Sequence, residues 1–298
     1  MTTDVMNLTS PSCVRDLLAQ IGLVPSRQRG QNFLIDRNIL DILLEEAAVR
    51  SSDTVLEVGP GLGVVTERLA GLARHVVAVE KDARLFEFLS RQFESQPSLT
   101  LLHADILDVP LDRPPVAGIT RMVSNLPYSV GSRVLVDLAQ LASPPARMVA
   151  MVQEEVSQRM AAGPQTREYG LLSLWLQLRY AVTVCRRVKP SCFLPPPDIN
   201  SSIVRMDLLS RELLAAPLRP LFYELSRVLF QHRRKQVGSI LAHAVGRELW
   251  DAVDVAEWLA ACGVDRTARP EALAMEDWCR MTQALAERKG VDFQRDAT

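Results

Sequence analysis

The fold of this chain is decided by one stretch, Thr54-Val55-Leu56-Glu57-Val58-Gly59-Pro60-Gly61-Leu62-Gly63. Its apolar, β-branched opening is typical of a strand that is buried on both faces. Three glycines follow at alternate positions, and residues 64–70 then have the pattern of a helix. Strand, glycine turn and helix form the first βα unit of a nucleotide-binding sheet, where glycine lets the backbone approach a ligand closely.

The next predicted strand ends in an acid. Residues 75–79 are an apolar run, and Glu80 follows them directly. A carboxylate at that strand end can accept hydrogen bonds from both ribose hydroxyls of an adenosine. The motif alone fits a dinucleotide or S-adenosylmethionine, and a tight turn without a ligand is the plainer alternative. Glu57 and Pro60 favour S-adenosylmethionine.

Further strands and helices extend this unit into an α/β sheet followed by helices. Strand patterns cover residues 99–103, 119–124, 146–152, 180–188 and 201–208, of which the last is predicted to be antiparallel. Helical patterns cover residues 14–21, 37–48, 83–93, 153–160, 169–177, 218–230, 235–245, 255–261 and 270–285. Because no strand pattern appears after residue 208, we predict a mostly parallel, Rossmann-like domain over residues 1–208 and a small α-helical domain over residues 209–298.

The composition is that of a packed cytoplasmic protein. Hydrophobic residues make up 48% of the chain and the mean hydropathy is +0.05, which argues against a disordered tract. The N-terminus lacks the features of a signal peptide, and no apolar run reaches the length of a membrane span. The five cysteines form no C-x-x-C pair and the four histidines show no ligand spacing, so we expect reduced thiols and no metal. We also expect a monomer.

The basic residues are unevenly distributed, although the net charge is only −1. Residues 179–242 hold eleven basic and four acidic side chains. Such an excess can form a polyanion-binding face that the average charge hides. We expect Arg227, Arg233, Arg234 and Lys235, the last three on a helix, to bind RNA. A solvated helix face is the alternative.

The tetrapeptide Asn125-Leu126-Pro127-Tyr128 follows the strand at residues 119–124. The carboxyl ends of parallel strands form the ligand crevice, so it should face the same cleft as Gly59, Glu80 and Asp105, although Asp105 could simply cap a turn. The amino group of adenine is a poor nucleophile, because its lone pair is delocalised into the ring. An amide oxygen and a backbone carbonyl could accept its hydrogens, while Tyr128 offers a face for stacking, worth roughly 1–3 kcal/mol per base. An ordinary turn with a buried tyrosine is the alternative.

Together these motifs resemble those of the small-subunit (16S) ribosomal RNA adenine N6,N6-dimethyltransferases, the KsgA/RsmA family. The resemblance runs from about Gln28 to Leu273. Besides the segments above, it rests on Gly30-Gln31-Asn32-Phe33-Leu34, Tyr169-Gly170-Leu171-Leu172-Ser173, Phe193-Leu194-Pro195-Pro196-Pro197, Leu229-Phe230-Gln231-His232-Arg233-Arg234-Lys235 and Arg269-Pro270-Glu271. It implies an S-adenosylmethionine-dependent methyltransferase sheet with a C-terminal RNA-binding domain.

The resemblance also implies roles for single residues. The cofactor would be bound by Gln31, Asn32, Leu34, Gly59, Gly61, Glu80, Asp105 and Asn125. The target amine would be held by Asn125 and the Leu126 carbonyl, and the target base would lie between Tyr128 and Phe193. Members dimethylate two adjacent adenosines in a hairpin loop near the 3′ end of 16S rRNA, late in assembly of the small ribosomal subunit, and so take part in rRNA processing and ribosome biogenesis.

The sequence departs from the family pattern at three places near the substrate. Gly131-Ser132-Arg133 stands where a proline is usual, Glu154 where a lysine is common, and Asp198 where a basic residue is common. Three other functions stay open. One is the related large-subunit rRNA adenine N6-methyltransferase of the resistance type. Another is a non-catalytic assembly or transcription factor on the same fold. An NAD-dependent dehydrogenase is the third, although no proton-donor constellation accompanies the glycines.

Overall fold

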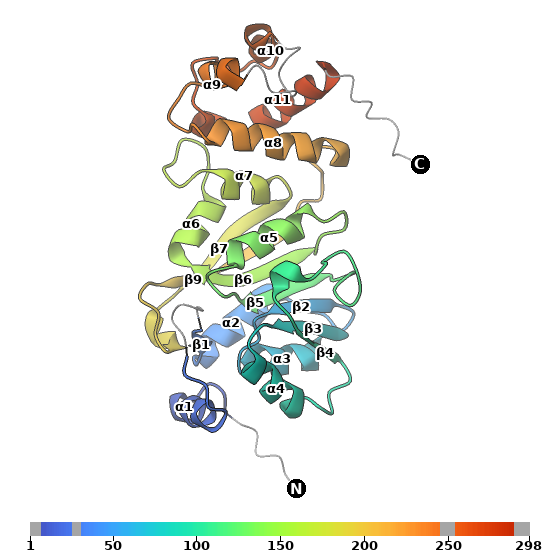
Figure 1. Cartoon of the computed structure of the whole chain (residues 1–298), viewed down its shortest axis with the longest axis vertical. Coiled ribbons are helices and arrows are strands. Elements are labelled where there is room, and N and C mark those ends of the chain that lie inside the picture. The colour runs from blue at the N-terminus through green and yellow to red at the C-terminus, as the bar shows by residue number, and fades with distance from the viewer. Residues whose placement is uncertain (1–6, 26–30, 245–253, 289–298) are drawn as a thin grey trace. The chain divides into compact units, whose positions relative to one another are not determined.

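The computed structural model describes residues 7–25, 31–244 and 254–288 (Figure 1). The chain divides into two compact units. Unit 1 comprises residues 1–158 and 180–208, and unit 2 comprises residues 159–179 and 209–298. Within the described residues, no helix is both long and apolar enough to cross a bilayer.

Unit 1 is built on a seven-stranded sheet of order β4-β3-β2-β5-β6-β9-β7. All neighbours pair in parallel up to β6, whereas β9 is antiparallel to both β6 and β7. The strands are β2 (Thr54–Val58), β3 (His75–Glu80), β4 (Leu99–His103), β5 (Arg121–Asn125), β6 (Arg147–Gln153), β7 (Tyr180–Val188) and β9 (Ser201–Leu208). The predicted mostly parallel sheet with an antiparallel last strand is confirmed.

The helices of unit 1 bury the apolar stripes that the sequence indicates. They are α1 (Pro11–Gln20), α2 (Arg37–Ala47), α3 (Val64–Leu72), α4 (Ala83–Gln92), α5 (Gly131–Gln140), α6 (Glu154–Ala161, whose last three residues belong to unit 2) and the 3-10 turns η1 (Ile106–Asp108) and η2 (Pro190–Cys192). The side chain of Asp36 begins α2 by accepting a hydrogen bond from the Ile39 N–H at 3.1 Å. Leu40, Leu43 and other apolar residues of α2 then pack with α3 against the sheet.

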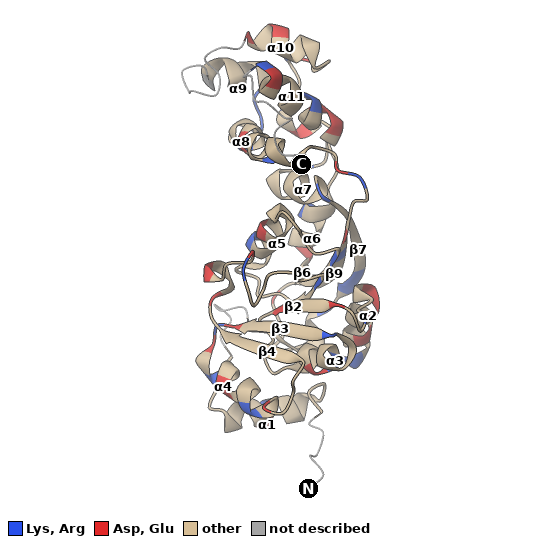
Figure 2. Cartoon of the chain, turned by 90° about the vertical axis from the view of Figure 1, so that its right-hand side faces the viewer, with Lys and Arg blue, Asp and Glu red and all other residues tan. Residues whose placement is uncertain are grey.

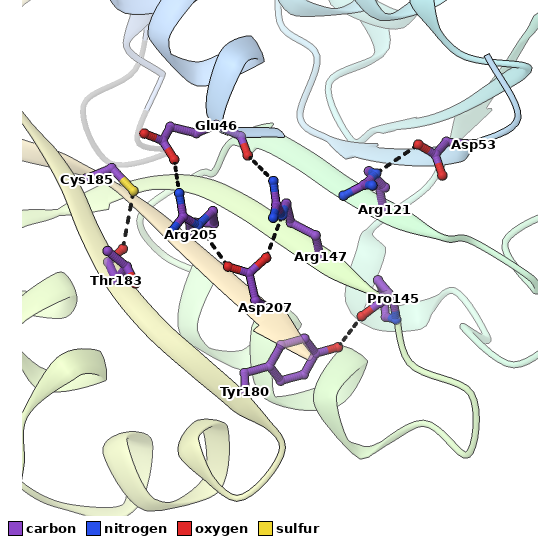
Figure 3. A network of polar contacts seen from close by, with 10 residues as sticks. All are labelled: Glu46, Asp53, Arg121, Pro145, Arg147, Tyr180, Thr183, Cys185, Arg205 and Asp207. Atoms are coloured by element: carbon purple, nitrogen blue, oxygen red, sulfur yellow. Dashed lines mark hydrogen bonds and ion pairs between the residues drawn. The ribbon is translucent and has the colours of Figure 1, made fainter. Parts of the chain in front are cut away.

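An ionic network ties the end of α2 to the antiparallel side of the sheet (Figure 3). The Glu46 carboxylate lies 2.5 Å from Arg205, which also contacts Asp207 at 2.8 Å. Arg147 pairs with Asp207 and donates a hydrogen bond to the Glu46 backbone carbonyl at 3.1 Å. Arg147 therefore satisfies a carbonyl in the last turn of α2, which has no partner within its own helix.

Unit 2 is helical, with its own apolar core. Its elements are α7 (Leu171–Gln177), η3 (Ala216–Leu218), α8 (Arg219–Phe230), α9 (Val237–Ala244), α10 (Val255–Ala261), η4 (Pro270–Ala272) and α11 (Met275–Arg288). The buried indoles of Trp258 and Trp278 lie in this core with side chains of α7, α8, α9 and α11. The stacked rings of Phe230 and Trp278 add a specific contact, with centroids 5.6 Å apart.

Residues 159–179 belong to unit 2, although the sequence placed them in the first domain. The reason is packing. Leu174 and Leu178 join the apolar core of unit 2, and the Trp175 indole donates a hydrogen bond to the Ser226 hydroxyl at 2.9 Å. The Tyr169 hydroxyl likewise donates to the Leu273 carbonyl at 3.2 Å. A domain boundary drawn only at residue 208 misses this returning segment.

Two short elements and two helices differ from the sequence predictions. The helix predicted over residues 270–285 is divided into η4 and α11, which begins at Met275. β1 (Phe33–Leu34) and β8 (Phe193–Leu194) form an antiparallel two-stranded ribbon that has no counterpart among the predicted strands. The helix predicted over residues 235–245 begins at Val237, and its last residue lies outside the described residues. Residues 231–235 form turns, so Arg233, Arg234 and Lys235 do not lie on a helix as predicted.

Candidate active site

A cavity of about 550 Å³ opens at the carboxyl ends of β2, β3, β4 and β5. These four strands are adjacent and parallel, so the residues that follow them meet at one edge of the sheet. This edge brings together Gly59 after β2, Glu80 at the end of β3, Asp105 after β4 and Asn125 at the end of β5. The cavity thus unites the predicted cofactor residues from all four strands.

The glycine turn brings bare backbone to the cavity. Gly59 and Gly61 have φ angles of +67° and +61°, a region that favours glycine. A Cβ atom on Gly59 would lie 2.9 Å from the Pro127 ring, and one on Gly61 would lie 3.2 Å from the Phe33 ring. Both positions therefore require glycine for backbone conformation and for space.

Glu57 lines the cavity but was not among the predicted site residues. Its side chain is only 2% exposed, and burial raises the pKa of its carboxyl to about 8. The nearby Glu80 carboxylate contributes to this rise in pKa. Atom Oε2 has no hydrogen-bond partner among the described residues. The signal in the sequence was its place two residues before the first glycine of the turn.

Glu80 is held in place by the backbone around it. Its Oε1 accepts a hydrogen bond from the Asp82 N–H at 2.8 Å, and its Oε2 accepts one from the Gly61 N–H at 3.3 Å. Burial raises the pKa of the Glu80 carboxyl. These bonds fix the carboxylate at the strand end, where the sequence predicts a ribose-binding acid.

Asp105 lines the cavity after β4, the strand next to β3, and Lys81 pairs with it. The Lys81 ammonium is 2.5 Å from Asp105 Oδ2, and this contact lowers the pKa of Asp105. Oδ1 accepts a hydrogen bond from the Leu107 N–H at 3.1 Å, so Asp105 also begins η1. Asp105 therefore both caps a turn and lines the cavity.

The N-terminal motif contributes a wall of the cavity. Gln31, Asn32 and Leu34 all line the cavity. Gln31 donates a hydrogen bond to Asp82 Oδ2 at 3.3 Å, and the Asn32 carbonyl accepts one from Asn125 Nδ2 at 3.0 Å. The second bond identifies the nitrogen of the Asn125 amide as the donor and leaves Oδ1 as the acceptor end of the same side chain.

The loop after β5 is anchored on its neighbours. The Leu126 N–H donates to the Met151 carbonyl on β6 at 3.2 Å, and the Leu126 side chain is buried. Asn125 and Pro127 line the cavity, whereas Leu126 and Tyr128 are next to the lining residues in the chain but not among them. The Tyr128 hydroxyl lies 2.7 Å from the Ser201 hydroxyl.

Phe193 does not offer the open ring face that stacking on a base requires. Its side chain is 2% exposed and packs in the apolar core with Leu34, Val188 and Ile203. The cause is the β1–β8 ribbon, which pairs Phe193 with Leu34. In this arrangement Phe193 is a core residue, and only Tyr128 of the expected stacking pair is partly exposed.

The predicted RNA-binding residues lie in unit 2 and have unequal surroundings. Arg233 pairs with Glu271 at 2.6 Å and donates to the Thr166 carbonyl at 3.1 Å. Arg234 and Lys235 are exposed, and the exposed Arg227 places its guanidinium 5.4 Å from the centroid of the Trp175 ring. In unit 1, basic residues lie along β7 and β9 (Figure 2). Among the described residues, no group of three or more His, Cys, Asp or Glu side chains could hold a metal ion.

The cavity fits S-adenosylmethionine by the chemistry of its walls. A glycine cradle that a Cβ would obstruct accommodates a closely approaching ligand, and the Glu80 carboxylate can accept hydrogen bonds from ribose hydroxyls. Oε2 of the buried Glu57 carboxyl, which has no hydrogen-bond partner among the described residues, can accept a hydrogen bond from the ammonium group at the methionine end of this cofactor.

Comparison with known proteins gives a consistent result. The ribosomal RNA small subunit methyltransferase A of Opitutus terrae is 40% identical over 277 residues, covering 90% of this chain and 96% of its own. A dimethyladenosine transferase from Plasmodium falciparum shares the fold, with a TM-score of 0.75 at 23% identity over 87% of this chain and 99% of its own. The 23S rRNA methyltransferase ErmE has a TM-score of 0.64 at 25% identity, covering 85% of this chain and 99% of its own.

The match to a whole family is equally extensive. Residues 26–287 match the family described as ribosomal RNA adenine dimethylase. That span includes the glycine turn, the acids after β3 and β4, and the loop after β5. With these residues assembled at one cavity, the chain belongs to the ribosomal RNA adenine dimethylase family.

Proposed function

We propose that this protein transfers methyl groups from S-adenosylmethionine to the N6 atoms of two adjacent adenosines in a hairpin loop near the 3′ end of 16S rRNA. The observation that carries the proposal is the Asn125 amide at the cavity, with its nitrogen engaged by the Asn32 carbonyl. Its oxygen is then the end of the amide that can accept a hydrogen bond from an amino group. Relatives named for methylation of the small ribosomal subunit support the choice of RNA.

Each part of the cofactor has residues of suitable chemistry. Glu80 would bind the ribose, and Asp105 would bind the adenine amino group. Gly59 and Gly61 would line the cofactor with their backbone. Gln31, Asn32 and Leu34 would cover the methionine end, and Glu57 would face it. When bound, the cofactor supplies an electrophilic methyl group on a sulfonium.

The residues of the loop after β5 would hold the target amine. Asn125 Oδ1 and the Leu126 carbonyl would accept the two amino hydrogens and draw the nitrogen lone pair out of conjugation with the ring. No base has to remove a proton before transfer, and no histidine is among the described residues that line the cavity. Positioning of the amine and electrostatic stabilisation would therefore account for the acceleration of methyl transfer. Tyr128, which is partly exposed, would contribute a face on which the base stacks.

The partner in this proposal is the precursor of the small ribosomal subunit. The protein would act on it as a monomer in the cytoplasm. Unit 2 would supply sequence-independent contacts to phosphates through Arg227, Arg234 and Lys235, which are exposed. The similarity to ErmE at 25% identity keeps large-subunit RNA as the second candidate substrate. Identity of 31% to 40% to the proteins named for the small subunit favours the first.

The test is methyl transfer to purified ribosomal subunits that lack this modification. We expect dimethyladenosine in nucleosides digested from the small subunit when wild-type protein and S-adenosylmethionine are added, and far less in the same reaction time with Asn125→Ala. Large subunits and protein-free 16S rRNA serve as parallel substrates. Modification of large subunits alone would favour the resistance-type activity. Cofactor binding without transfer to any of these RNAs would favour a non-catalytic assembly factor.

A further inference from the structure

The antiparallel strand β9 begins at the edge of the sheet that holds the cavity. β9 runs opposite to β6, so its first residue, Ser201, pairs with Gln153 at the carboxyl end of β6. Two residues earlier on β6, Met151 pairs with Asn125 on β5. Ser201 therefore lies at the same carboxyl edge as the proposed amine-binding loop, although 73 residues separate it from Tyr128.

Ser201 places a hydroxyl where an apolar side chain would be expected. Its exposed fraction is 0%, and it lies between β6 and β7 at the start of a strand that continues with Ile203 and Val204. Serine has no special preference for strands, and a buried hydroxyl is costly unless it is hydrogen-bonded. The bond that satisfies it joins Ser201 Oγ to the Tyr128 hydroxyl, 2.7 Å away.

The Tyr128 side chain is held at its far end by this bond, while its backbone is held by the loop. Leu126 is anchored to Met151, and Pro127 packs so close to Gly59 that a Cβ there would lie 2.9 Å from the proline ring. Without the Ser201 bond, the tyrosine ring could still rotate about its two side-chain torsions. With it, both ends of the residue are fixed.

We propose that Ser201 is a positioning residue that holds the Tyr128 ring in register with the Asn125 amide during methyl transfer. This inference rests on the proposed function. Because a reaction that depends on placing one amine is sensitive to small displacements, loss of the bond should slow transfer more than it weakens binding. Ser201 acts through Tyr128, since its own side chain is buried.

A purely structural hydrogen bond in the same unit offers a matched control. The Tyr180 hydroxyl donates to the Pro145 carbonyl at the same distance, 2.7 Å (Figure 3). Neither of these two residues lines the cavity. Ser202, which follows Ser201 and is also buried, provides a second control. Tyr180→Phe and Ser202→Ala should each retain the wild-type transfer rate.

The experiment is single-turnover methylation of small subunits with Ser201→Ala, Tyr128→Phe and the double variant, beside the two controls. We expect Ser201→Ala and Tyr128→Phe each to slow transfer about tenfold, with the affinities for S-adenosylmethionine and for the subunit within about twofold of wild type. The double variant should be no slower than either single variant, since each removes the same bond. Tyr128→Phe leaves Ser201 in place and so tests the bond even where Ser201→Ala folds poorly.

The possible outcomes separate this inference from the proposed function. Wild-type rates in both single variants, multiplied losses in the double variant, or an equal loss in Tyr180→Phe would each overturn the role of Ser201 while leaving the methyltransferase proposal intact. Absence of transfer by wild-type protein would overturn the proposed function and this inference with it.

Discussion

The cavity edge of unit 1 and the basic turn of unit 2, residues 231–235, differ in how far local sequence determines their roles. At the cavity edge, four adjacent parallel strands deliver Gly59, Glu80, Asp105 and Asn125 to one place. In the basic turn, three consecutive basic residues have different environments, because Arg233 pairs with Glu271 whereas Arg234 and Lys235 are exposed. Topology thus brings strand-end residues to one place, whereas neighbours in a turn need not share an environment.

The strongest test of the cavity edge is Asn125→Ala. If its amide positions the amine mainly in the transition state, turnover should fall about 10²–10³-fold, as when one preorganised polar group is removed from an active site. Binding of RNA should change little. Single-turnover methyl transfer and filter binding measure the two effects. Asn38→Ala, on the exposed side of α2, is the matched control. A collapse of RNA binding with a surviving transfer step would contradict the role of Asn125.

Glu80→Ala tests whether the cavity edge binds the cofactor. Removing a hydrogen-bonding carboxylate should weaken S-adenosylmethionine binding by about 1.5–3 kcal/mol, measured by calorimetry. The variant also frees the N–H groups of Gly61 and Asp82, so a thermal melt should accompany the titration. Unchanged cofactor affinity in a folded variant would show that Glu80 does not bind the cofactor. Position at a strand end would then not be enough to predict a role at the cavity edge.

Glu57→Gln tests the electrostatics of the buried carboxyl. The pKa of Glu57 is raised from 4.5 to about 8 by burial, so the folded protein without cofactor binds one more proton than the unfolded chain between these pH values. The resulting stability is fully present below pH 4.5 and is lost as the pH rises through about 8, with a slope of about 1.4 kcal/mol per pH unit. The free energy of unfolding of wild type minus that of the variant, measured by denaturant at pH 5.5, 6.5 and 7.5, should decrease with this slope as the pH rises. A difference that does not depend on pH would mean that Glu57 is already ionised.

Much of unit 1 could be predicted because its signals are local. An apolar run with glycines after it specifies β2 and its turn, and spacing places the acids at strand ends. The β1–β8 ribbon could not be predicted, because each strand has two residues and the pairing depends on contacts between distant segments. For the same reason the burial of Phe193 and the pairing of Arg233 with Glu271 have no local signature.

Substitutions in the basic turn are predicted to have the smallest effect. The exposed Arg234 can be tested separately from Arg233, which pairs with Glu271. Replacing Arg234 and Lys235 together by alanine should flatten the log-log salt dependence of binding to the small subunit by about 1.4, taking roughly 0.7 per phosphate contact on single-stranded RNA. Affinity for S-adenosylmethionine should not change, because the cavity residues belong to unit 1.

Arg233→Ala is the internal control for this double variant. Its guanidinium contacts Glu271 and the Thr166 carbonyl, so its loss should lower the free energy of unfolding by up to about 1 kcal/mol, the range of partly exposed ion pairs. The salt slope should stay near the wild-type value, because this side chain is committed within unit 2. Fluorescence anisotropy at several salt concentrations, together with thermal unfolding, measures both quantities. A wild-type slope in the double variant would show that Arg234 and Lys235 are only solvated. A flattened slope in Arg233→Ala alone would show that the ion pair opens to bind phosphate.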